Sequence, residues 1–239
     1  QLAIGGKSVQ ITGMAKGSGM IGPNMATMLC VVLTDAALEP NAAEELLRSV
    51  AGETFNCISV DGHTSTNDTM LMLANGAAVE EPLAGADLAA FSAAVKEVCT
   101  DLARAIAADG EGAQHLVTID IGGCRSQADA TTMARSVANS PLVKTAIAGA
   151  DPNWGRIVSA VGYAGVPFDP AGLSLKLNGA LLFENGAPVP FDRPAVSQSM
   201  RDNRDTHVEL ALSEGEASAR FWTCDLTNEY IRINADYHT

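Results

Sequence analysis

A run of six apolar residues, Met28 to Leu33, follows directly on a glycine-rich segment, and this pairing constrains the fold more than any other part of the chain. The preceding residues 13–23 read GMAKGSGMIGP and contain four glycines and a proline, which suit tight turns. A short apolar run is typical of a strand covered on both faces, so we predict such a strand at 27–34. The turns are then expected to present the bond between Ala26 and Thr27 at the start of that strand.

Hydrophobic periodicity predicts the elements around this strand. Apolar residues spaced three or four apart between Leu88 and Ile106 indicate an amphipathic helix that packs one face on a core. Asn41 is a candidate N-cap for an earlier helix. The other predicted elements are strands at 7–12 and 116–123 and helices at 41–50 and 128–140, the last ended by Pro141.

The C-terminal region has short apolar or alternating stretches separated by turn residues, which favours β-strands. These stretches read LSLKLNG, ALLFENG, HVELALS, ARFWTCDLT and, at residues 230–236, YIRINAD. Prolines at 167 and 170 mark an internal boundary. We therefore predict an α/β (α+β) chain with mixed sheets, helices on their faces and a β-rich C-terminal region, divided into residues 1–26, 27–166 and 167–239.

Composition and charge narrow the classes of function. Hydrophobic residues make up 47% of the chain and charged residues 18%, which fits a packed globular protein and not a disordered one. The net charge of −13 argues against nucleic acid and anionic membranes as partners, because both repel an acidic surface. We also expect no membrane span, since the sequence lacks a sufficiently long apolar run.

The first residues and the cysteines suggest where the protein works. The sequence begins QLAIGGKSVQ, without an initiator methionine or an export signal, so we expect a piece of a longer product. The five cysteines lie far apart and form no CxxC pair. This pattern fits free thiols in a reducing compartment, and we predict a cytoplasmic protein.

Thr27 is the residue with the most informative position. The ordinary interpretation is a β-branched residue that suits a strand. If the peptide bond before it were cleaved, however, its own α-amine could act as base for its hydroxyl. The unperturbed pKa of an α-amine is about 7.7–8, so part of it is neutral near pH 7 and can accept that proton.

Five motifs in order then carry a family resemblance: GMAKGSGMIGPNMATML, VDGHTSTNDTMLMLANG, ADGEGAQHLVTI, SPLVKTAIAGADPNWGRI and INADYHT. Together they resemble the C-terminal part of the precursor of the ornithine acetyltransferase family of arginine biosynthesis, also called glutamate N-acetyltransferase. The resemblance implies an N-terminal-nucleophile-like fold and self-cleavage between Ala26 and Thr27. Residues 1–26 would then end the family's α chain, while 27–166 would carry the nucleophile and 167–239 the β-rich remainder.

The resemblance also implies the reaction and the partners. Thr27 would take the acetyl group from N2-acetylornithine as an acetyl-threonine ester and pass it to glutamate, which is ping-pong chemistry. No cofactor and no metal is implied, because the ester itself holds the acetyl group. The N-terminal chain of the same precursor would stay associated in a hetero-oligomer of α and β chains, such as a heterotetramer. The sequence leaves open whether acetyl-CoA is a second donor.

Four further residues match substrate-binding positions of the family. Lys16 could pair with the α-carboxylate that both substrates share, and Glu111 could hold a substrate amino group. Asn234 and Thr239 match binding positions near the family's C-terminus. Without the resemblance these would be a solvated lysine, a loop acid and a fraying tail. The family's oxyanion hole is expected upstream, outside this chain.

Two polar stretches keep alternatives open. Residues 61–68, DGHTSTND, contain carboxylates and a histidine, which raises a metal site as an alternative to hydrogen-bonded turns. We favour turns, because hydrogen-bonded turns use the same residue types and His63 has no second histidine nearby. The family pattern has aspartate where His63 stands, so no charge role is transferred to it, and we interpret Thr64 to Asp68 as structural support near the site. The loop 149–157, GADPNWGRI, has two interpretations, a capped helix start with Trp154 in the core and the mouth of the substrate pocket, and we favour a mixture of the two.

Two other functions compete with acetyl transfer. A related self-processing aminopeptidase or amidase would give the acyl group to water, although such relatives commonly use serine where this chain has Thr27. An unprocessed, catalytically silent chain would serve only as a structural subunit. The three hypotheses differ in the acyl acceptor and in the fate of the Ala26–Thr27 bond.

Overall fold

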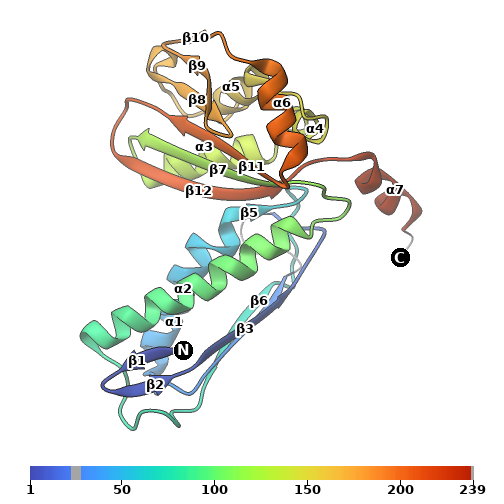
Figure 1. The fold of residues 1–239 in the computed structure, drawn as a ribbon. Helices are drawn as coiled ribbons and strands as arrows, with labels where there is room; N and C mark the ends of the chain where they lie inside the picture. The colour runs from blue at the N-terminus through green and yellow to red at the C-terminus, as the bar shows by residue number, and fades with distance from the viewer. Residues whose placement is uncertain (23–27, 238–239) are drawn as a thin grey trace. The chain divides into compact units, whose positions relative to one another are not determined.

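The computed structural model describes residues 1–22 and 28–237 and divides the chain into two compact units, Gln1–Ile106 and Ala107–Thr239 (Figure 1). Both contain sheets and helices, which confirms the predicted mixed α/β class. The division into 1–26, 27–166 and 167–239 remains a prediction. Within the described residues, no helix is long and apolar enough to cross a membrane.

The first unit is built on a sheet of β3 (Ile11–Lys16), β4 (Leu29–Thr34) and β6 (Thr69–Ala74), with β4 in the centre. β3 is antiparallel to β4 and β6 is parallel to it. A hairpin of β1 (Leu2–Ile4) and β2 (Lys7–Val9) precedes the sheet. The strand predicted at 7–12 is therefore interrupted between β2 and β3.

Helices α1 (Pro40–Glu53) and α2 (Gly85–Ala108) confirm the two helices predicted in this unit. Asn41 is not the N-cap of α1, because the helix begins one residue earlier at Pro40 and Glu39 takes the cap position. Proline suits the first turn, where its missing N–H has no intrahelical partner anyway. A short 3-10 turn η1 (Phe55–Cys57) and strand β5 (Ile58–Ser59) follow α1.

Only one face of β4 is covered within the described chain. Cys30 and Val32 are buried, whereas Leu29 and Leu33 are 46% and 36% exposed. The covered face packs on α2, since a Cβ on Gly13 of β3 would lie within 2.8 Å of a methyl group of Val98. The expectation that both faces are covered is thus wrong for the described residues, because the side chains on the other face are exposed.

The second unit contains six strands in the order β10-β9-β8-β11-β7-β12. β7 lies between β11, which is parallel to it, and β12, which is antiparallel. These strands confirm the strand predicted at 116–123 and most of the β-rich C-terminal region. Their bounds are β7 (Leu116–Cys124), β8 (Ser174–Leu177), β9 (Ala180–Glu184), β10 (Ala187–Pro188), β11 (Asp205–Ala211) and β12 (Ala217–Cys224).

Helix α3 packs on β7 and β12 and contributes to the core of this unit (Figure 1). Along β7, Ile119 and Ile121 are buried while Asp120 between them is partly exposed, the alternation of a strand with one covered face. The helices are α3 (Gln127–Ala138), α4 (Pro141–Ala148), α5 (Trp154–Gly162), α6 (Arg193–Asp202) and α7 (Asn228–Asp236), with a 3-10 turn η2 (Pro170–Gly172).

Helix α7 corrects the prediction that residues 230–236 are a strand. Thr227 caps the helix, because its side chain accepts a hydrogen bond from the Glu229 N–H at 3.2 Å. Arg232 pairs with Glu229 one turn earlier, a spacing that only a helix brings together. These local contacts outweigh the strand-like apolar pattern.

Candidate functional site

Lys16 ends β3 at the edge of the first unit where β4 begins. It pairs across the sheet with Leu29, two residues after Thr27 in the sequence, and its side chain is exposed. An exposed ammonium at this edge can meet a carboxylate from solvent. The other predicted residues of this region, Ala26 and Thr27, lie outside the described residues.

Asp61 anchors the glycine-rich segment upstream of the predicted cleavage bond. Its Oδ2 accepts a hydrogen bond from the Met20 N–H at 2.8 Å and its Oδ1 one from the Ile21 N–H at 3.1 Å. The Ile21 carbonyl in turn accepts from the Val60 N–H at 2.8 Å. The backbone before the cleavage motif is therefore held by the loop that follows β5.

Gly22 continues this contact by close approach of two backbones. A Cβ there would lie 2.7 Å from the Gly62 carbonyl carbon, which real side chains do not tolerate. The His63 N–H donates to Asp61 Oδ1 at 3.2 Å, and the His63 side chain is exposed. The carboxylate of Asp61 therefore organises a hydrogen-bonded turn in the stretch considered as a metal site.

Asp68 holds the backbone on the downstream side of the predicted cleavage bond. Its Oδ1 accepts a hydrogen bond from the Met28 N–H at 2.8 Å, and the Thr69 N–H donates to the Met28 carbonyl at 3.0 Å. The other oxygen, Oδ2, is buried and has no partner among the described residues. Burial raises the pKa of the Asp68 carboxyl, and the bond from Met28 opposes that rise.

In the second unit the structure brings Glu111 and Asn234 together from positions 123 residues apart. The Asn234 side chain donates to Glu111 Oε2 at 2.8 Å and to the Tyr230 carbonyl at 3.0 Å. Asn234 is exposed and Glu111 partly so, which leaves both accessible to a small molecule. Thr239, the remaining predicted binding residue, lies outside the described residues.

Gly112 explains how α7 reaches Glu111. Its φ is +70°, and a Cβ there would lie 2.5 Å from the Tyr230 backbone nitrogen. The hydroxyl of Thr227 donates to the Gly112 carbonyl at 2.7 Å. The first turn of α7 is thus seated directly on the glycine that follows Glu111.

A buried carboxylate fixes the same loop from the other side. Asp225 Oδ1 accepts hydrogen bonds from the Gln114 N–H at 2.8 Å and the His115 N–H at 3.0 Å. Its Oδ2 lies 2.9 Å from His115 Nδ1. The loop that carries Glu111 is therefore held at both ends by groups from the C-terminal part of the chain.

The loop 149–157 is a capped helix start, one of the two alternatives. The Asn153 side chain accepts from the Arg156 N–H at 3.2 Å and begins α5. Trp154 stacks on Phe183, with ring centroids 5.4 Å apart. Arg156 Nη1 donates to the Leu142 carbonyl at 2.9 Å and so ties α5 to α4.

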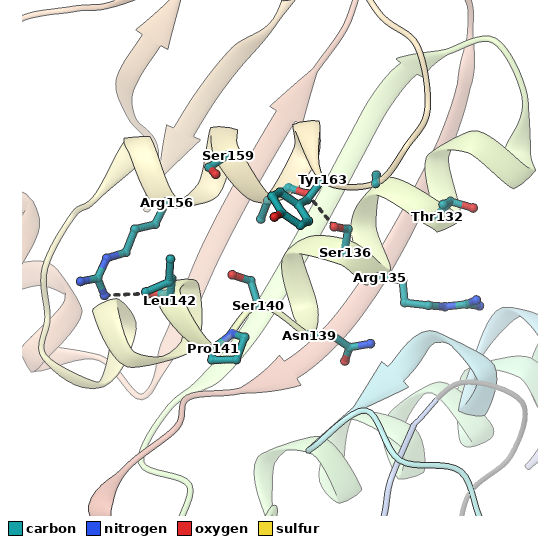
Figure 2. A pocket seen from close by; sticks show the side chains of 12 residues that line it. Thr132, Arg135, Ser136, Asn139, Ser140, Pro141, Leu142, Arg156, Ser159 and Tyr163 are labelled. Carbon is teal, nitrogen blue, oxygen red and sulfur yellow. Dashed lines mark hydrogen bonds between the residues drawn. The ribbon is translucent and has the colours of Figure 1, made fainter.

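A cavity of about 610 Å³ lies among α3, α4 and α5 (Figure 2). Of the predicted site residues that the structure describes, Lys16, Glu111 and Asn234, none lines it. Figure 2 shows Arg135 and Arg156 extending in different directions, with Ser136 and Ser140 between them. Two of its polar side chains are already engaged, since Ser136 donates to the Ala160 carbonyl at 2.6 Å and Arg156 to the Leu142 carbonyl at 2.9 Å.

The predicted site residues thus fall into two groups, Lys16 in the first unit and the Glu111–Asn234 pair in the second. From the sequence we expect Thr64 to Asp68 to give structural support near the site, and the bond from the Met28 N–H to Asp68 agrees with this. The sequence does not identify that partner, nor the close approach of α7 to Gly112. For Gly112 the DGEG motif indicated a turn but not the helix that packs on it.

Comparisons with known proteins find the same family along the whole chain. The model of the ArgJ family matches residues 1–239. A Rhodopirellula baltica protein named arginine biosynthesis bifunctional protein ArgJ is 46% identical over 241 residues, covering 100% of this chain and 59% of that protein. The protein of the same name from Bacillus subtilis is 45% identical with the same coverage. This chain therefore spans less than two thirds of the length of these relatives.

A solved structure of a protein with the same name is also similar to this chain. The crystal structure of arginine biosynthesis bifunctional protein argJ from Bacillus halodurans matches with a TM-score of 0.84 and 36% identity. The match covers 87% of this chain and 98% of the solved chain.

Proposed function

Since the chain belongs to the ArgJ family, we propose that it is the nucleophile-bearing part of an acetyltransferase that moves the acetyl group of N2-acetylornithine to glutamate. The observation that best supports this is the hydrogen bond between Glu111 and Asn234. Both were expected to bind substrate from the family pattern alone. Their meeting across 123 residues is what a shared binding site requires.

Maturation begins with the Thr27 hydroxyl attacking the carbonyl carbon of Ala26. The acyl group moves from the Thr27 nitrogen to its oxygen, and water then hydrolyses the ester to leave a free α-amine.

Transfer then uses the same hydroxyl twice. The α-amine of Thr27 takes the hydroxyl proton as the oxygen attacks the acetyl carbonyl, and ornithine leaves with a proton on its amine. The amine of glutamate attacks the acetyl-threonine ester, and the Thr27 oxygen recovers its proton. Because each substrate meets the enzyme in turn, the kinetics are ping-pong.

The family pattern gives each binding group its own role. Lys16 pairs with the α-carboxylate that ornithine and glutamate share, as a point charge at the strand edge. Glu111 accepts a hydrogen bond from a substrate amino group, and Asn234 orients the Glu111 carboxylate. Removing one charged partner of this kind typically weakens an interaction by about 1.5–3 kcal/mol.

The uncovered face of the first unit supports an associated chain. Its exposed apolar residues lie on adjacent strands and are Met14, Leu29, Leu33, Leu71 and Leu73. An apolar sheet face of this kind marks an interaction surface. We propose that the N-terminal chain of the same precursor covers it, since 41% of the Rhodopirellula baltica relative lies outside the match.

The test is transfer by the full-length precursor with its N-terminal half. N-acetylornithine labelled in the acetyl group is mixed with glutamate, and labelled N-acetylglutamate is measured while both concentrations vary. Parallel double-reciprocal lines support the proposal. Label released as acetate regardless of glutamate would instead identify an amidase, and no product would identify a silent chain.

Acetyl-CoA is tested as a second donor in the same assay. The relatives' name contains the word bifunctional, which supports a second activity. Labelled acetyl-CoA replaces N-acetylornithine, with Thr27→Ala as control. Formation of N-acetylglutamate that Thr27→Ala abolishes would establish this donor at the same nucleophile.

A further inference from the structure

The turn that carries Glu111 is closed by its own backbone. The Ala113 N–H donates to the Gly110 carbonyl at 2.9 Å, which makes a four-residue turn with Glu111 and Gly112 at its centre. Gly112 has a φ of +70°, the left-handed value that a type II turn requires at its third residue. The direction of the Glu111 side chain therefore depends on how this turn is held from outside.

Asp225 holds the two residues that follow the turn. Its Oδ1 accepts hydrogen bonds from the Gln114 N–H at 2.8 Å and the His115 N–H at 3.0 Å, and its side chain is fully buried. Its Oδ2 lies 2.9 Å from Nδ1 of the His115 ring. Donors that converge on a carboxyl group favour its charged form, so Asp225 is an acceptor on both oxygens.

The segment that contains Asp225 is anchored in turn by Lys144 of α4, a buried cation that the proposed reaction does not use. Its Nζ donates to the Thr223 hydroxyl at 2.8 Å and to the Cys224 carbonyl. The Lys144 carbonyl accepts from the Leu226 N–H at 3.3 Å. Asp225 therefore lies on a fixed segment, with the residues on both sides tied to α4.

Both nitrogens of the His115 ring face oxygen acceptors. Nδ1 meets Asp225 Oδ2, and Nε2 lies 3.1 Å from the Met200 carbonyl in the last turn of α6. A neutral imidazole has one N–H, so the lone pair of its other nitrogen would face an oxygen here. Only the doubly protonated ring can donate to both oxygens. The His115 side chain is 12% exposed, so little water is available to replace either bond.

We propose that His115 is a positioning residue for Glu111 and that it acts as an imidazolium ion, bound to Asp225 on one side and to the Met200 carbonyl on the other. This inference rests on the proposed role of Glu111 in binding a substrate amino group. The ring ties the Glu111 turn to α6, and Asp225 ties it to the segment that leads into α7, which carries Asn234. Loss of the ring should loosen the turn, weaken substrate binding and leave the chemical step unchanged.

The charge of the ring is tested on the cleaved full-length protein with ¹⁵N-labelled histidine. At about pH 7 an ordinary histidine, with a pKa of about 6.5, is mostly neutral. We expect two protonated nitrogens for His115. Asp225→Asn keeps an oxygen for the backbone N–H groups but turns an amide NH₂ toward Nδ1, so the ring should retain only the proton on Nε2. A single protonated nitrogen in the wild type would overturn the proposal.

The positioning role is tested by steady-state transfer, with the melting temperature measured for each variant. His115→Leu should raise KM for N-acetylornithine by about 10-fold, the effect of losing a hydrogen bond to a charged group. Its kcat should change by less than about 2-fold, because Glu111 holds the substrate before and during the reaction alike. Asp225→Asn should raise KM by about 3-fold, since neutral hydrogen bonds replace stronger charged ones.

His207→Leu is the matched control, because it removes a second histidine–aspartate pair of the same unit. The His207 ring bonds to Asp120 at 2.8 Å, and its N–H donates to the Asn178 side chain at 2.8 Å. It should keep the wild-type KM and leave the His115 signal in place, which also assigns that signal. An equal rise of KM in both leucine variants would show general loosening and overturn the proposal.

The remaining outcomes separate this inference from the function on which it rests. An active wild type with unchanged KM in Asp225→Asn overturns the positioning role alone, even if His115→Leu does not fold. A wild type that neither cleaves nor transfers overturns the proposed function and the positioning role with it.

Discussion

Replacing Gly112 with alanine tests whether the docking of α7 positions Asn234. The new Cβ would lie 2.5 Å from the Tyr230 backbone nitrogen, and an ordinary contact begins at 3.4 Å. The first turn of α7 must therefore move by about 0.9 Å, or the Gly112 loop must move by the same amount. Either shift lengthens the 2.8 Å bond between Asn234 and Glu111 toward the limit of a hydrogen bond.

The expected effect on activity follows from that displacement. A misplacement of about 1 Å in a binding group costs up to about 100-fold in rate, so kcat/KM for acetyl transfer should fall by about 10- to 100-fold. The positive φ of +70° adds backbone strain of about 1–2 kcal/mol to the same variant. Activity and melting temperature are therefore measured together on the full-length protein.

Gly165→Ala separates strain from displacement. Gly165 has a φ of +71°, and no atom of the described residues lies within 4 Å of the position that the added methyl group would take. The substitution should lower the melting temperature by a few degrees, as Gly112→Ala does, and keep normal turnover. Equal loss of activity in the two variants, or full activity in Gly112→Ala, would refute the link between α7 docking and the site.

Three other predictions test different parts of the molecule. Lys16→Ala should raise KM for N-acetylornithine and glutamate together, and an effect on only one substrate would contradict the shared carboxylate contact. Leu71→Asp should weaken retention of the N-terminal chain in gel filtration after cleavage, whereas Leu142→Asp, similarly exposed on the other unit, should not. Asp120 is partly buried, which raises its pKa, but bonds from Arg220 and His207 lower it below the ordinary value. The charged Asp120 therefore stabilises the fold above about pH 4, and this contribution is lost as the pH falls. In Asp120→Asn the free energy of unfolding, measured with urea, should depend less steeply on pH in the acid range. An unchanged slope would count against this.

Much of the fold could be predicted because its elements depend on local sequence. The period of α2 and the apolar run of β7 each involve residues close together in the chain. Residues 230–236 defeat this reasoning, since their apolar pattern alternates as in a strand. The helix is stabilised by the Thr227 cap and by the hydrogen bond from the Thr227 hydroxyl to the Gly112 carbonyl, 115 residues away. The sequence pattern does not reveal so distant a contact.

The face of β4 shows a second limit. Leu29 and Leu33 have the character of core residues, so a strand covered on both faces was the natural prediction. Sequence reports that a side chain is apolar but not which surface covers it, and within the described chain only the α2 side is covered.

Site residues could be predicted where they match a motif of the family, but contacts between distant segments could not. Lys16, Glu111 and Asn234 come from the family pattern. The sequence indicates a supporting role for Asp68, but its partner, the Met28 N–H 40 residues away, is known only from the structure.

The central claim is that Thr27 is freed by self-cleavage and then carries the acetyl group. It is tested most directly by the denatured mass of the full-length protein, before and after N-acetylornithine is added without glutamate. We expect two fragments, one that starts at Thr27 and gains the mass of one acetyl group, and a single uncut chain for Thr27→Ala. Cleavage in Thr27→Ala, or an acetyl group found on another residue, would contradict it.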